Sequence, residues 1–278
     1  MLIQILIQKN TNKRDALNGI PLFNPYLYVI HSDNRIIKNM SNFKVVHAEA
    51  FPQQIQWQYR DTFALLLIPL IMLNGWLASL LFSQATQIAL ADTIFRGGLF
   101  LVLCYLYKEM LIRHWQYFNR ASLKSWLLVI VGAIVLQGLI SITRAFLPIE
   151  HTVNPKEEAP IDPQTIAFIP LLFISLGPIF TALIEDMVFR YTLLHKLFIP
   201  KISMRIILVL LNSILFGLIH YHNFDGHLIA TVSFMAAGLF LNVVYLWTRN
   251  IWHVLLIHVL NNAVLSLGAV ILLKVFAL

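Results

Sequence analysis

The stretch "LIEDMVFRYTLLH", residues 183–195, carries three charged side chains within an otherwise apolar run, and they are Glu185, Asp186 and Arg190. Charges at membrane depth are rare and usually face a protein interior or a wet cavity. Asp186 and Arg190 are four residues apart, so they share one helix face and can neutralise each other. Glu185 is left over, about 100° around the helix. A buried carboxylate without a partner suits acid–base catalysis, whereas the simpler interpretation is a structural ion pair beside a protonated Glu185.

The composition of the whole chain is that of a membrane protein. Of 278 residues, 59% are hydrophobic and 12% are charged, whereas about a quarter of the residues of a soluble domain are charged. The formal net charge of +7 indicates a preferred orientation against a bilayer rather than a nucleic-acid partner, because no basic stripe is interleaved with aromatic residues. Cys104 is the single cysteine, so an intrachain disulfide is excluded.

Seven segments are long and apolar enough to span a membrane, which takes about 20 residues. They are roughly 62–82, 91–111, 126–147, 166–194, 204–222, 228–248 and 252–275. We therefore predict an all-α fold, a polytopic bundle of transmembrane helices. We expect three regions: a cytoplasmic extension of unknown fold at 1–60, N-terminal transmembrane helices at 61–165, and a core at 166–278 that contains Glu185, Asp186 and Arg190. If translation starts at Met40 instead, residues 1–39 carry no function.

Lysine and arginine alternate between the predicted loops, as the positive-inside rule requires. The basic loops contain Lys108, Arg113, Arg120, Lys124, Lys196, Lys201, Arg205 and Arg249. The segment "SQATQIALAD" has none, and residues 148–165 have Lys156 against four acidic residues. This pattern predicts a multi-pass protein of the plasma (inner) membrane, with its N-terminus in the cytoplasm and its C-terminus outside.

Two further predicted spans carry polar residues at helical spacing. In "FGLIHYH", residues 216–222, His220 follows Phe216 by four positions, and in "HVLNN" His258 and Asn262 are likewise four apart. Alone, His220 is more typical of an interfacial residue. The His258–Asn262 pair could be an interhelical hydrogen-bond clasp worth about 1 kcal/mol.

These residues have similar predicted depths. Counted at 1.5 Å per residue from the basic residue at the end of each span, Glu185, His220 and His258 lie about 16, 22 and 13 Å deep. Helix tilt can absorb such differences. We therefore expect a polar pocket within the membrane, opening to the cytoplasm.

The three motifs together resemble those of the CAAX protease and bacteriocin-processing family, which includes the type II CAAX prenyl proteases. "EDMVFR" resembles the EExxxR motif, "FGLIH" the FxxxH motif and "HVLNN" the HxxxN motif, in the same order, within about residues 166–275. The resemblance implies a helical membrane protease with a buried conical cavity, acting on a membrane-associated protein or peptide. The second acid is Asp186, where the family motif has Glu.

The resemblance also implies the roles of the site residues. Glu185 would be the general base, with His220 helping to activate a water. His258 and Asn262 would stabilise the oxyanion. Asp186 and Arg190 would hold the helix that carries Glu185.

Two questions stay open in the sequence. Glu185, His220 and His258 are also a possible Zn set, but the compact His-Glu-x-x-His signature is missing, so we favour chemistry without a cofactor and keep Zn as the alternative. The competing functions are a non-catalytic immunity or scaffold protein with a relict site, and a proton-linked transporter. The expected partners are the lipid bilayer and a membrane-associated substrate.

Overall fold

The computed structural model describes residues 47–148, 162–198, 200–224 and 226–276. The chain divides into residues 1–44, which lie outside the described part, and a second unit from Val45 to Leu278, to which everything below refers. The expected extension at 1–60 and the alternative start at Met40 thus fall mostly outside the described residues and stay predictions.

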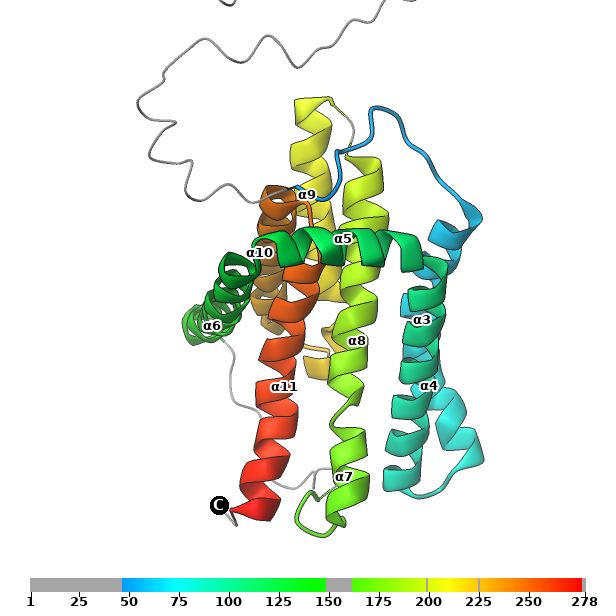
Figure 1. Cartoon of the computed structure of the whole chain (residues 1–278). Helices are drawn as coiled ribbons and strands as arrows, with labels where there is room; N and C mark the ends of the chain where they lie inside the picture. Colours follow the sequence, from blue (N-terminus) through cyan, green and yellow to red (C-terminus); the bar gives the residue numbers. More distant parts are fainter. Residues whose placement is uncertain (1–46, 149–161, 199, 225, 277–278) are drawn as a thin grey trace, which may run out of the picture. The chain divides into compact units, whose positions relative to one another are not determined.

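All regular structure in the described ranges is helical, which confirms the predicted all-α bundle (Figure 1). The α-helices are α3 (Tyr59–Leu81), α4 (Ala85–Leu106), α5 (Lys108–Arg120), α6 (Ser122–Phe146), α7 (Phe168–Ile174), α8 (Gly177–Asp186), α9 (Ile202–Leu218), α10 (Val232–Thr248) and α11 (Ile251–Val275). A π-helical segment, η3 (Met187–His195), continues α8, and two short 3₁₀ turns, η4 (Tyr221–Phe224) and η5 (Leu228–Thr231), connect α9 to α10.

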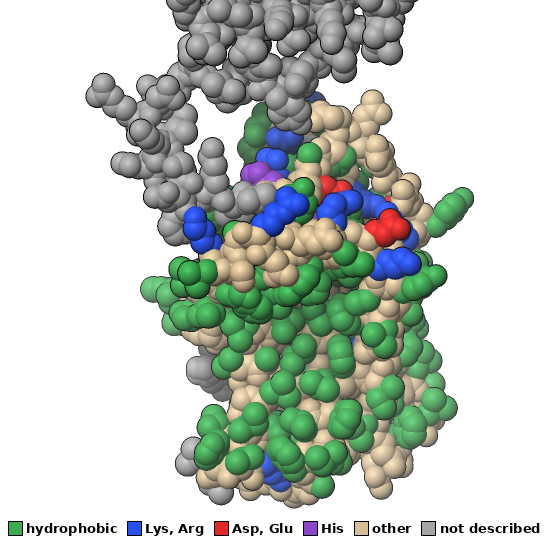
Figure 2. Space-filling model, in the orientation of Figure 1, with side chains coloured by type: hydrophobic (Ala, Val, Ile, Leu, Met, Phe, Trp, Pro, Cys, Tyr) green, Lys and Arg blue, Asp and Glu red, His purple; other side chains and the backbone are tan. Residues whose placement is uncertain are grey.

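Six of these helical stretches are long and apolar enough to cross a membrane. They are Tyr59–Leu81, Ala85–Leu106, Ser122–Phe146, Phe168–His195, Leu228–Thr248 and Ile251–Val275. Their outward side chains are largely Leu, Ile, Val and Phe, as lipid contact requires (Figure 2). The chain is therefore a multi-pass membrane protein. The remaining predicted span, 204–222, is a shorter apolar helix that ends at Leu218, where the polar sequence "HYHNFDGH" begins.

The second predicted span differs from the structure at its C-terminal end. The spanning helix α4 ends at Leu106, and α5 follows as a separate helix that runs across one end of the bundle (Figure 1). Along α5, Met110, Leu111 and Phe118 are buried while Arg113 and Arg120 are exposed. Such an amphipathic helix lies along a membrane surface rather than through it.

The helix that carries Glu185, Asp186 and Arg190 departs from regular α-helical geometry at two places. Pro178 lies in the first turn of α8, where its missing N–H costs no helical hydrogen bond, so the chain can restart there after α7. At Met187 the helix widens to π geometry, which is uncommon and occurs frequently at functional sites. The side chains from Met187 to Thr192 are all buried.

The packing of the neighbouring helices leaves a cavity on one side of α8. The helix packs on α4 and α11, and α11 packs on α6, whereas α9 packs on α10 and on η3. A Cβ at Gly217 would lie 2.8 Å from the backbone nitrogen of Met235, so the close approach of α9 and α10 requires glycine there. The end of α9 is therefore fixed on α10 and faces α8 across a cavity.

Candidate active site

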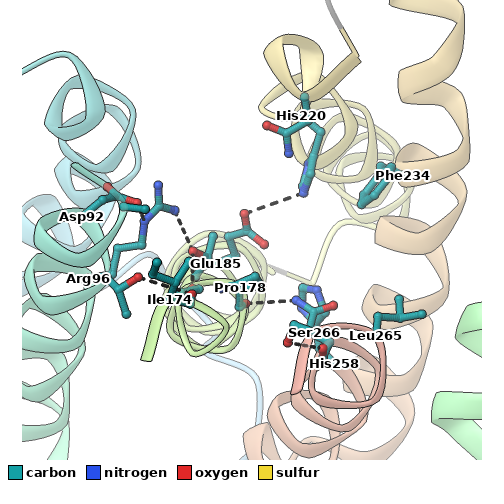
Figure 3. A pocket seen from close by; sticks show the side chains of 16 residues that line it. Asp92, Arg96, Ile174, Pro178, Glu185, His220, Phe234, His258, Leu265 and Ser266 are labelled. Carbon is teal, nitrogen blue, oxygen red and sulfur yellow. Dashed lines mark hydrogen bonds and ion pairs between the residues drawn. The ribbon is translucent and has the colours of Figure 1, made fainter. Parts of the chain in front are cut away.

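The four residues that we expected to be catalytic line one cavity of about 480 Å³ (Figure 3). They are Glu185, His220, His258 and Asn262, and they come from α8, the end of α9 and α11. Further walls are formed by α4, α7 and α10. The structure thus brings together side chains up to 77 positions apart in the chain.

Glu185 and His220 face each other across this cavity. The Glu185 Oε1 and the His220 Nε2 are 3.8 Å apart, and both side chains are nearly buried. The His220 Nδ1 lies 2.9 Å from the carbonyl oxygen of Phe216, and a carbonyl can only accept, so Nδ1 carries the proton. In the neutral ring Nε2 is then an acceptor, like the carboxylate opposite. Phe234 stacks on the imidazole with ring centroids 4.2 Å apart and holds its plane.

Two acceptors aimed at one gap need a donor between them. A water molecule that donates one hydrogen to each would satisfy both, and the separation of 3.8 Å is too long for a direct hydrogen bond. The arrangement is therefore suited to hold and polarise a single water.

Asp186 joins two of the other site residues. Its Oδ1 lies 3.0 Å from the Arg190 Nη1, with both side chains fully buried, which is the expected i,i+4 ion pair. Its Oδ2 accepts a hydrogen bond from the His258 Nδ1 at 3.3 Å, a contact that the sequence spacing does not reveal. Arg190 also lies 4.1 Å from the centre of the Phe216 ring, the residue that orients His220.

Asn262 ties α11 to the start of α8. Its Nδ2 donates to the carbonyl oxygen of Pro178 at 3.0 Å, and the Nδ2 of Asn261 donates to its Oδ1 at 3.3 Å. Asn261 thereby fixes which way the Asn262 amide faces. One N–H of that amide is left for a ligand in the cavity.

A network on α4 lines the same cavity and was not part of the predicted site. The Arg96 Nε is 2.7 Å from the Asp92 Oδ2, and its Nη1 donates to the Thr181 Oγ1 at 2.6 Å (Figure 3). Asn74 donates to the other oxygen of Asp92 at 2.7 Å. Thr181 lies one turn before Glu185 on α8. Asp92 and Arg96 are a charged i,i+4 pair within a predicted span, and this spacing could have indicated them as site residues. Nothing in the sequence showed which helix the pair would face.

The choice between chemistry without a cofactor and a zinc site stays a prediction. Within the described ranges no three His, Cys, Asp or Glu side chains are grouped closely enough to bind one ion. The His258 Nδ1 is engaged with Asp186 and the His220 Nδ1 with a backbone carbonyl, which leaves both Nε2 atoms for a ligand. The mechanism proposed below uses the side chains alone, with Zn as the alternative.

Part of the chain matches a model of a known protein family. Residues 167–264 match a family model described as "Rce1-like: Type II CAAX prenyl endopeptidase Rce1-like". No curated protein and no solved structure matches the chain. The matched region begins at the foot of α7, ends within α11 and contains all three motifs, which confirms the resemblance seen in the sequence. Over residues 167–264, from α7 into α11, the chain is similar to the Rce1-like family of type II CAAX prenyl endopeptidases.

Proposed function

We propose that this chain is an intramembrane endopeptidase that hydrolyses a peptide bond of a membrane-associated protein or peptide. The observation that carries the proposal is the pair of acceptors, Glu185 and His220, facing each other at 3.8 Å within an apolar bundle. The family match supports a protease of this type. We further propose that it resides in the plasma membrane with its N-terminus in the cytoplasm, as the Lys/Arg distribution indicates.

In the first step, a water between the two acceptors attacks the scissile carbonyl carbon. The water gives one proton to Glu185, and His220 orients it through its second hydrogen. General-base assistance of this kind contributes about 10²–10⁴-fold. The proton then passes from Glu185 to the leaving nitrogen, and the C–N bond breaks to give a carboxylic acid and an amine.

In the same step the carbonyl oxygen gains negative charge. The free N–H of Asn262 and the ring of His258 lie on the neighbouring wall of the cavity. His258 can donate from Nε2 when both ring nitrogens carry protons, and the Asp186 carboxylate beside Nδ1 offsets that charge. One oxyanion donor is worth about 2.7–4 kcal/mol of transition-state stabilisation.

The proposal is tested by comparing peptide termini in membranes that contain the wild type, Glu185→Gln or Glu109→Gln. Glu109 lies exposed on α5 and serves as the matched control. We expect a set of new termini with the wild type and with Glu109→Gln that disappears with Glu185→Gln. Identical termini in all three membranes, with equal protein levels, would favour the alternative of a non-catalytic immunity or scaffold protein, for which the Asp186 departure from the family motif is the supporting observation.

A further inference from the structure

Arg96 brings a positive charge to the cavity that contains the candidate catalytic residues, and the steps proposed above do not use it. The residue lies on α4, outside the segment that matches the family model. It lines the cavity of about 480 Å³ and also a second cavity of about 280 Å³, and Glu185 and His220 line both of them. Among the described residues that line these two cavities, no other is a lysine or an arginine.

The guanidinium of Arg96 is held in one orientation by the protein. Its Nε lies 2.7 Å from the Asp92 Oδ2, and its Nη1 donates to the Thr181 Oγ1 at 2.6 Å. The Asp92 carboxylate is itself fixed by the Asn74 Nδ2 at 2.7 Å. The Thr181 hydroxyl donates its own hydrogen to the carbonyl oxygen of Gly177, so it can only accept from Arg96. A planar group fixed in this way is a directional donor.

The third nitrogen of this guanidinium is left for a ligand. Nη2 carries two hydrogens, and the hydrogen bonds that Arg96 makes within the described part of the chain use Nε and Nη1. Nη2 is also not one of the buried side-chain atoms left without a partner, so it is open to the cavities that Arg96 lines. Arg96 therefore presents N–H donors to whatever occupies the site.

Arg96 and the proposed oxyanion donors lie on opposite sides of Glu185. The helix α8 packs on α4 and on α11, and Figure 3 shows Glu185 between Arg96 and His258. In an extended polypeptide, successive carbonyl groups point in opposite directions. A substrate whose scissile carbonyl faces His258 and Asn262 therefore turns the neighbouring carbonyl toward Arg96.

The charges around Arg96 favour a neutral acceptor over an anion. Asp92 and Glu185 are two carboxylates beside one guanidinium, so this wall of the cavity has a net negative charge and repels a further carboxylate. A peptide carbonyl has no charge. It loses its hydration when it enters a cavity at membrane depth, and it then needs a donor from the protein.

From these observations we infer that Arg96 binds the substrate, with its Nη2 donating to the backbone carbonyl next to the scissile one. This assignment rests on the proposed function, because it concerns the substrate of the same site. Arg96 thus holds the polypeptide extended across Glu185, with the scissile carbonyl directed at His258 and Asn262.

Steady-state kinetics of the purified protein test this contact, with a peptide that spans a cleavage site found in the comparison of membrane termini. Arg96→Lys keeps the charge beside Asp92 but lacks the planar fork and its third nitrogen. We expect KM to rise by about 10- to 100-fold, as for the loss of a hydrogen bond from a charged donor. The value of kcat should stay close to that of the wild type, because the contact is made before and during the reaction.

The matched control is Asn74→Leu. It removes a hydrogen bond from the same network but leaves Arg96 in place, so it should lower the unfolding temperature without changing KM. Hydrolysis with an unchanged KM in Arg96→Lys would overturn the inference and leave the protease standing. An equal rise in KM in both variants would mean that Arg96 only joins α4 to α8, which also overturns it. No hydrolysis by the wild type would overturn the proposed function, and this contact with it.

The acceptor has its own test. Each of the two carbonyls adjacent to the scissile one is replaced in turn by a thioamide, whose sulfur is a weaker hydrogen-bond acceptor. One of the two replacements should raise KM for the wild type and leave KM of Arg96→Lys unchanged. If neither does so, or if amidation of the C-terminal carboxylate of the peptide has that effect instead, Arg96 does not bind the neighbouring carbonyl and the inference is wrong.

Discussion

The buried pair of Asp186 and Arg190 allows a quantitative prediction about stability. Both side chains are fully buried and 3.0 Å apart, and the Arg190 Nε makes no hydrogen bond with the described residues. Asp186→Asn keeps the shape and an acceptor for His258 but removes the carboxylate that is ion-paired with the guanidinium, which then has only the charge of Glu185 nearby. Breaking a buried pair from one side costs about 3–5 kcal/mol. At about 2–4 °C per kcal/mol for a chain of this size, the unfolding temperature should fall by about 10 °C.

A second substitution separates the charge from the shape. Arg190→Met alone leaves the Asp186 carboxylate unpaired and should destabilise to a similar extent, although its thioether can still pack on the Phe216 ring. The double variant Asp186→Asn/Arg190→Met contains no buried charge at this pair. It should therefore be more stable than either single variant, with a coupling energy of about 2–3 kcal/mol.

Thermal unfolding of the four purified proteins in one detergent, followed by tryptophan fluorescence, measures this cycle. The reasoning is refuted if the two single effects add in the double variant. Additive effects would mean that Asp186 and Arg190 act through other neighbours, and that the expected ion pair does not hold the helix of Glu185.

Three further predictions concern pH, packing and metal. Burial alone would raise the pKa of Glu49, but the hydrogen bond with His114 and the charge of Arg113 lower this pKa from 4.5 to about 2. The contribution of the ionised Glu49 to stability is thus complete above about pH 4.5 and is lost toward pH 2. Only the wild type, and not Glu49→Gln, should therefore show this pH dependence in its unfolding temperature. Gly217→Ala should destabilise the protein by about 1–3 kcal/mol and reduce cleavage, because the added Cβ would lie 2.8 Å from the α10 backbone. The control is Gly138→Ala, whose added Cβ meets nothing within 4 Å. It should change neither the unfolding temperature nor the rate of cleavage in the same assays. A strong chelator should leave cleavage by the purified protein unchanged; a loss that Zn²⁺ restores would show that the site needs a metal.

Spacing alone could predict the parts of the site that lie on single helices. Asp186 with Arg190, and His258 with Asn262, are four residues apart, and regular helices place such pairs on one face. The seven apolar segments likewise predicted where the helices lie, because burial of an apolar run in lipid dominates the choice of structure.

Contacts between helices could not be predicted in this way. The hydrogen bond from His258 to Asp186 depends on how α11 packs on α8, and the Arg96 network depends on which face α4 turns inward. The π geometry of η3 has no simple sequence period, so the spacing of residues did not predict it. The basic residues of α5 indicated that it is separate from α4. Mean hydropathy over a span-length segment does not show this boundary, because the segment includes residues of both helices.

The most direct test of Glu185 as the group that activates water is the rate of hydrolysis by the purified protein. The substrate is a peptide spanning a cleavage site found in the comparison of membrane termini, and the enzymes are the wild type and Glu185→Gln. The account predicts that the rate falls by about 10²–10⁴-fold while the unfolding temperature stays within a few degrees. Equal rates for the two proteins would contradict it.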